Sequence, residues 1–181
     1  RDFSVQWSDD GASWTTAWSV SGSTSWGNTE FRRFVNSSYN PPYLGSPFGS
    51  HVYWRTYVVL SESAAAASMG ELEFRATIGG ATQTTGGTPS ASSIFSGSFT
   101  ADKAFDGSTA TLWSASAAPS WLQYQFVSAV TVGEVVIKSR SDSSATTSPK
   151  DFIVQFADSP GGPWSSTFRR TAETGWTLNQ T

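Results

Sequence analysis

Two stretches near opposite ends of the chain repeat one pattern. RDFSVQWSDDGASW opens the sequence, and KDFIVQFADSPGGPW lies close to its end. The pairs that match at one constant spacing are Asp2/Asp151, Phe3/Phe152, Val5/Val154, Gln6/Gln155 and Asp9/Asp158. After one extra residue in the second turn, Trp14, Trp18 and Trp26 match Trp164, Phe168 and Trp176. A repeat of about 150 residues is too long for a solenoid unit and has the size of a whole domain.

We therefore expect parts of two tandem domains. Residues 1–75 are predicted to be the C-terminal half of one repeat, and residues 76–181 the N-terminal two-thirds of the next, joined near Gly79–Gly87. The sequence begins at Arg1 without Met or a signal peptide, so we expect a processed protein or a segment of a longer one. A complete domain could form in permuted order within residues 1–149, or from pieces of neighbouring chains.

Alternation of apolar and polar residues predicts β-strands in both copies of the pattern. Phe3, Val5 and Trp7 would share one face of an extended chain. Further strands are predicted at His51–Leu60, Glu71–Arg75, Trp121–Phe126 and Val130–Lys138, between turns rich in Gly, Pro, Ser and Asp. Ser61–Met69 has no amphipathic stripe and is expected to be a loop with one helical turn. Since sheets with one apolar face must pack face to face, the predicted fold class is an all-β sandwich.

The composition agrees with this fold and narrows the function. Hydrophobic residues make up 38% of the chain and charged residues only 14%, compared with roughly 25% charged in an average soluble protein. The net charge of −3, with scattered basic residues, argues against nucleic-acid binding. No apolar stretch approaches the roughly 20 residues that cross a bilayer, so membrane insertion is not expected. The absence of Cys excludes disulfides and thiolate metal sites but does not fix the compartment.

The most specific pattern lies in SASSIFSGSFTADKAFDGSTATLWSA, Ser90–Ala115. Asp106-Gly107 is followed by Thr111-x-Trp113, and then by WLQYQF and VTVGEVVIKSR. This order resembles the front half of a discoidin domain, also called a coagulation factor 5/8 type C domain, and is similar to family-32 carbohydrate-binding modules. PKDFIVQFADSPGGPW, HVYWRTYVV and GELEFR resemble the back half, in the right cyclic order. The resemblance implies a discoidin-like jelly-roll β-sandwich. The sequence motifs are also similar to those of tandem repeats in bacteriophage tail and fibre proteins.

The resemblance also implies a structural calcium ion. In the family, the Asp-Gly turn and a Glu on the final strand hold the ion. The matching ligands are Asp106, Thr111 and Glu71, with the backbone carbonyls of Phe105 and Ser108 as additions. Oxygen atoms in a tight turn suit Ca²⁺, which takes 6–8 oxygen ligands. Because Glu71 falls in the preceding repeat, a complete site would need permuted or inter-chain pairing. The alternative is an Asx-turn closed by hydrogen bonds without metal.

Aromatic residues on strands are expected to differ in role from those in loops. Trp7, Trp54, Trp113 and Trp121 lie on strand patterns and are predicted to pack in the core.

Aromatic residues in the Pro/Gly-rich loop Asn36–Ser50 are candidates for stacking on sugar rings, namely Tyr39, Tyr43 and Phe48. The loop Lys138–Pro149 supplies Arg140 and Asp142 as candidate polar contacts to sugar hydroxyls. The alternative is that the aromatic residues cap the sandwich or pack against a neighbouring unit.

The sequence offers little for catalysis. His51 is the only histidine and lies at a strand start without a Ser or Asp motif beside it. Adjacent Asp9 and Asp10 on a hairpin turn would point apart, and the second copy has Asp158-Ser159 at that place. No phosphate-loop, dinucleotide or zinc spacing is present.

These observations predict a non-enzymatic repeat of an extracellular or phage virion (tail or fibre) protein that attaches to cell-surface glycans. Its other partners would be neighbouring repeats or subunits of a fibre. One alternative is a purely structural repeat without ligand. A second is an ancillary carbohydrate-binding module of a glycoside hydrolase.

Overall fold

Strands with alternating sequence form antiparallel sheets in the computed structural model, which describes residues 3–7, 12–13, 15–20, 49–63, 65–142, 145–178 and 180–181. The chain divides into two units, Arg1–Pro42 and Tyr43–Thr181, and each is described by itself. In the first unit, β1 (Phe3–Trp7) and β2 (Thr15–Val20) form an antiparallel hairpin. The predicted repeat boundary at residues 75/76 falls inside the second unit and stays a prediction.

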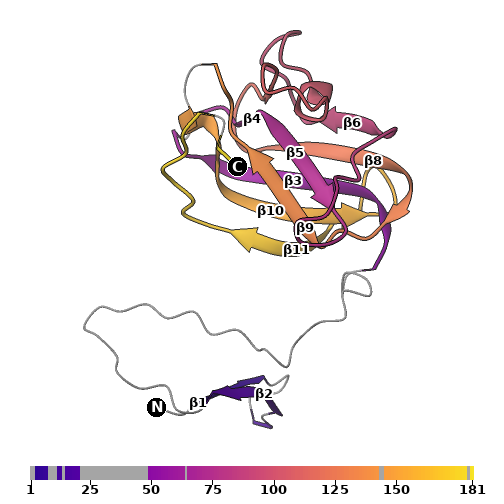
Figure 1. Cartoon of the computed structure of the whole chain (residues 1–181), viewed down its shortest axis with the longest axis vertical. Coiled ribbons are helices and arrows are strands. Elements are labelled where there is room, and N and C mark those ends of the chain that lie inside the picture. Colours follow the sequence, from indigo (N-terminus) through magenta and orange to yellow (C-terminus); the bar gives the residue numbers. More distant parts are fainter. Residues whose placement is uncertain are drawn as a thin grey trace. The chain divides into compact units, whose positions relative to one another are not determined.

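The second unit contains a five-stranded antiparallel sheet in the order β11–β10–β3–β8–β6 (Figure 1). Its strands are β3 (His51–Ser61), β6 (Thr88–Ala91), β8 (Ser120–Val130), β10 (Pro149–Ala157) and β11 (Ser165–Arg170). The central strand β3 pairs with β10 on one side and β8 on the other. The predicted strands His51–Leu60 and Trp121–Phe126 are confirmed within β3 and β8.

A second layer covers the inner face of this sheet. It consists of the pair β5 (Glu71–Arg75) with β9 (Glu134–Lys138) and the pair β4 (Ser68–Met69) with β7 (Trp113–Ser114). Two short 3₁₀ turns, η1 (Ala101–Ala104) and η2 (Ala145–Thr147), lie in the connections. The result is the predicted all-β, discoidin-like sandwich.

The core lies between the two layers, and alternate residues of β3 point into it. Trp54, Thr56 and Val58 of β3 are fully buried, while the residues between them are half-buried. The opposite layer contributes Leu72 and Phe74 of β5. Each large aromatic side chain buried in this way contributes several kcal/mol of stability, so this face of β3 fixes how the layers pack.

Two sequence predictions are wrong in this region. Trp54 and Trp113 are in the core as predicted, but Trp121 is only half-buried and lies outside it, because Leu122 is the inward residue. The predicted single strand Val130–Lys138 is broken after Val130, where Thr131–Gly133 crosses to the other layer and the Gly133 N–H donates to the Arg75 carbonyl (2.8 Å).

The stretch Ser61–Met69 also differs from the prediction of a helical turn. Among its described residues, it contains the end of β3, a turn at 62–63 and the short strand β4.

Gly87 is required by the close approach of β6 to β8. A Cβ at Gly87 would lie 2.3 Å from the Gln125 carbonyl oxygen and 2.5 Å from the Tyr124 ring, whereas a Cβ at Gly97 would meet nothing. We expect Gly87→Ala to destabilise the fold by about 1–3 kcal/mol, because backbone atoms must move. Thermal unfolding measures the change, with Gly97→Ala as the matched control. Equal melting temperatures for the two variants would contradict this packing.

Candidate functional site

An open cavity of about 420 Å³ lies where β3 begins and where the β10–β11 turn folds over it. It is lined by His51, Phe156, Ala157, Asp158, Ser159, Gly162, Pro163 and Ser165. The register of β3 with β10 creates this arrangement, since Phe156 pairs with Trp54 and Ala157 with Tyr53. Pairing therefore brings the turn next to a residue more than 100 positions earlier in the chain.

The cavity wall is built around His51. Its imidazole stacks on the Phe156 ring, with centroids 3.9 Å apart and an interplanar angle of 19°. His51 Nδ1 lies 2.9 Å from Asp158 Oδ1, and because a carboxylate only accepts, Nδ1–H is the donor. The Asp158 side chain is 73% exposed, so its carboxylate also faces solvent. The wall thus combines an aromatic stack, an oriented imidazole and an accessible carboxylate.

This arrangement suits binding better than catalysis. A His–Asp pair could activate a nearby hydroxyl, but the Ser159 hydroxyl donates to the Gly162 carbonyl within the turn. Ligand pockets combine apolar and aromatic walls with a few placed polar groups, and small-molecule pockets span roughly 300–1,000 Å³. A cavity of this size, with one carboxylate at its rim, can hold a small polar ligand with an apolar face.

A cluster of aromatic side chains around one arginine lies on the outer face of the sheet. The Arg55 guanidinium lies 3.8 Å from the centre of the Trp164 ring and also near Trp121 and Tyr57. Its Nε donates to Gln155 Oε1 at 2.8 Å. Burial lowers the pKa of Arg55 from its usual value. Trp121 therefore belongs to a cation–π cluster on the outer face.

The predicted ligand-binding residues fall into two groups. Tyr39, Tyr43 and Phe48 lie outside the described residues, although the sequence of their loop runs directly into His51. Arg140 and Asp142 form a bidentate ion pair, with Nε–Oδ1 at 2.6 Å and Nη2–Oδ2 at 2.8 Å.

The Arg140–Asp142 pair lies at the opposite end of β3 from the cavity. Arg140 contacts Thr147, just before β10, and β10 begins opposite Ser61. Because β3 has 11 residues, roughly 35 Å separates its two ends. Arg140 and Asp142 are therefore not brought together with the His51 cavity.

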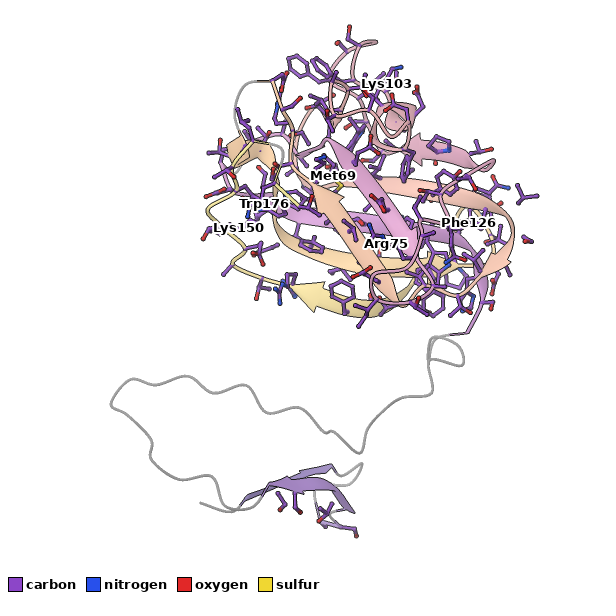
Figure 2. The ribbon with its side chains drawn as sticks, in the orientation of Figure 1. Met69, Arg75, Lys103, Phe126, Lys150 and Trp176 are labelled. Carbon is purple, nitrogen blue, oxygen red and sulfur yellow. The ribbon has the colours of Figure 1, made fainter. Side chains whose placement is uncertain are left out.

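The predicted calcium turn is compact. Asp106 Oδ1 accepts from the Ser108 N–H (2.9 Å), and the Thr111 hydroxyl donates to both Asp106 oxygens (2.8 and 2.9 Å). Gly107 has φ +73°, which few other residues adopt at low cost. Lys103, labelled in Figure 2, lies 4.0 Å from Asp106 Oδ2. The Phe105 ring packs on Tyr124 at 4.9 Å. The hydrogen bonds of an Asx-turn are thus present.

Glu71 faces this turn from β5. Its side chain is buried, and Oε1 has no hydrogen-bond partner among the described residues. Burial, and then the charge of Asp106, raises the pKa of Glu71 to about 7. Two carboxylates, a threonine hydroxyl and turn carbonyls form an oxygen donor set that fits a hard cation. The described residues contain no cluster of three or more His, Asp or Glu, so backbone and hydroxyl oxygens would have to complete the shell.

A second cavity of about 300 Å³ lies beside β9 and β10, lined in part by Arg170, Glu173 and Trp176. Arg170 Nε pairs with Glu173 Oε2 at 3.1 Å, and Trp176 Nε1 donates to the Pro149 carbonyl. Figure 2 shows Trp176 beside Lys150. Because these polar groups already have hydrogen-bond partners within the chain, this cavity presents weaker ligand chemistry than the one at His51.

The sequence alone does not reveal the His51 cavity as a candidate binding site. The sequence pattern predicts a strand at Phe156, a turn at Asp158 and a strand start at His51, and it does not indicate that these residues meet. One signal was available, because Asp158 has a counterpart in Asp9 of the other copy. A carboxylate repeated at a turn marks a position with a specific contact.

The structure is that of a β-sandwich with an open cavity beside the β10–β11 turn. The chain matches the F5/8 type C domain family over residues 88–181, and it belongs to that family. The family comprises non-catalytic modules that bind carbohydrates or other ligands, typically in extracellular or surface-displayed proteins. No curated protein and no solved structure matches the chain significantly. Within the described residues, no helix is long and apolar enough to span a membrane.

The raised pKa of Glu71 predicts how the stability of the fold depends on pH. The folded protein holds the Glu71 proton up to about pH 7, whereas the unfolded chain releases it near its ordinary value of 4.5. Without added metal, this group should lower stability as the pH rises from 4.5 through 7. We expect Glu71→Gln to have a free energy of unfolding about 1–3 kcal/mol higher than that of the unmodified protein at pH 8, and therefore a higher melting temperature. At pH 4.5 the two proteins should differ little. Glu73→Gln, on the same strand, is the control. An equal gain at both pH values would contradict the prediction.

Proposed function

We propose that the chain is a non-catalytic carbohydrate-binding repeat of an extracellular or phage virion (tail or fibre) protein that attaches to cell-surface glycans. The observation that carries the proposal is the cavity at His51, in which an aromatic stack adjoins an accessible carboxylate. Membership of a ligand-binding family supports the general role. The tail or fibre context rests on the resemblance of the sequence to phage repeats.

The chemistry of the cavity favours a sugar. A carboxylate such as Asp158 accepts hydrogen bonds from hydroxyl groups, and charge-assisted bonds are about twice as strong as neutral ones. Sugars also present apolar C–H faces that pack on the apolar wall around Phe156. The cavity is open, so one site should bind weakly, and repetition along a chain would supply avidity.

We also propose that Ca²⁺ binds Asp106, Thr111 and Glu71, with the carbonyls of Phe105 and Ser108. The buried Glu71 oxygen without a partner supports this assignment. The ion would neutralise two facing carboxylates and tie β5 to the turn before β7. Its role would be structural, because the His51 cavity lies at the other end of β3.

Glycan binding is tested with the full chain on a glycan array, followed by calorimetric titration of the strongest oligosaccharide. We expect Asp158→Asn to weaken binding tenfold or more, because a charged hydrogen bond contributes about 1.5–3 kcal/mol. Phe156→Ala should also weaken it by removing the apolar wall.

Asp142→Asn is the matched control, since it changes the same residue type at the opposite end of β3. Loss of binding in Asp142→Asn alone would move the site to the Arg140 loop. An array without any signal would favour the purely structural repeat.

Calcium binding predicts a metal-dependent melting temperature. At pH 8, millimolar Ca²⁺ should raise the melting temperature of the unmodified protein, because the ion binds only the folded state. Glu71→Gln should lose most of this rise. A rise of equal size in both proteins would exclude Glu71 as a ligand, and no rise in either would leave the Asx-turn without metal as the better description.

A further inference from the structure

Two hairpins in the chain have the same pairing register. Phe3 pairs with Val20 in β1–β2, and their counterparts Phe152 and Arg170 pair in β10–β11. The agreement continues through every pair of both hairpins. The β-bulge also recurs, between Val5 and Gln6 in one hairpin and at the equivalent place in the other. The repeated sequence therefore encodes one local structure twice.

The residues that hold β10–β11 against β3 are the ones that the repeat preserves. Phe152 and Val154 pair with Val58 and Thr56 of β3, and both are buried. Polar and aromatic contacts come from Gln155 and Trp164 to Arg55, and from Asp158 to His51. The counterparts in the first copy are Phe3, Val5, Gln6, Trp14 and Asp9, identical in residue type.

Three positions that pair with or lie beside β3 differ between the two copies. Ser4 stands in place of Ile153, which is half-buried opposite Tyr57 on the outer face. Trp7 stands in place of Phe156, which lines the open cavity. A third difference falls on a buried position, because Ser8 stands in place of Ala157 and would bring a hydroxyl group there.

We propose that β1–β2 is an interchangeable copy of β10–β11, and that it pairs with β3 of its own chain in a second state. β3 has one edge for a hairpin, because β8 occupies the other. Two segments that share most of their docking residues compete for that edge, and the difference in free energy between the two states sets their populations. The covalent link gives the β1–β2 hairpin of the same chain a far higher effective concentration than that of a second molecule.

Disulfide trapping tests the second state directly, because the full chain contains no cysteine. Ile153 lies opposite Tyr57 in the structure, so Ser4 would lie opposite Tyr57 in the second state. Cα atoms of directly opposite residues are about 4.5–5.5 Å apart, within the range that a disulfide bridges. The test variant is Ser4→Cys/Tyr57→Cys, and Ile153→Cys/Tyr57→Cys traps the state seen in the structure.

The control is Ser4→Cys/Val127→Cys, because Val127 is 83% exposed on β8 and away from the contested edge. After oxidation with oxidised glutathione, we expect the Ser4–Tyr57 disulfide in monomeric protein at several times the control yield, by peptide mass spectrometry. A yield equal to the control would overturn the proposal. Disulfide-linked dimers alone would overturn the assignment to the same chain.

The melting temperatures of two single variants and of the double variant provide a second test that does not depend on disulfide trapping. Val5→Asp should leave the melting temperature almost unchanged, and Val154→Asp should lower it only in part, because β1–β2 takes the vacated edge. The double variant should lose more than the sum of the two single losses. The proposal fails if Val154→Asp alone loses as much as the double variant.

Discussion

The pairing of β3 on both edges is the constraint on which the rest of this structure depends. Its inner face carries Trp54, Thr56 and Val58 into the core, and its outer face carries Arg55 into a cluster with Trp164 and its neighbours. Because one strand sets both faces, its register with β10 fixes the core, the cation–π cluster and the cavity together. A slip of one residue would exchange the two faces and abolish all three.

The length of β3 separates two kinds of chemistry. At its start, His51 and the β10–β11 turn form an open cavity with a carboxylate at the rim. Near its end lie the Arg140–Asp142 pair and the loops that precede β10. The Asp106 turn connects to this end, because the Ser141 hydroxyl donates to the Thr109 carbonyl. A structural ion there can stabilise the sandwich without touching a ligand at His51.

Much of the fold could be predicted, because alternation and repetition are properties of local sequence. Alternation with a period of two residues predicts β3, β5 and β8, but it does not indicate which face of a strand points inward. It therefore predicts Trp121 in the core, where the structure has Leu122. The His51 cavity could not be predicted, since His51 and Asp158 meet only through the register of two strands distant in sequence. The Asp106 turn is local, and its internal hydrogen bonds follow from the spacing of Asp106, Ser108 and Thr111.

Asp158 has two roles, and together they connect ligand binding with the proposed competition between the β1–β2 and β10–β11 hairpins. It fastens the β10–β11 turn to His51, and it also presents its carboxylate to the cavity. If β1–β2 takes the edge of β3, Asp9 would supply the same carboxylate, while Trp7 would replace Phe156 in the wall. The cavity would keep its polar contact and gain a larger aromatic surface. A ligand that packs better on indole than on phenyl would therefore shift the population toward the second state, by no more than its difference in affinity for the two walls.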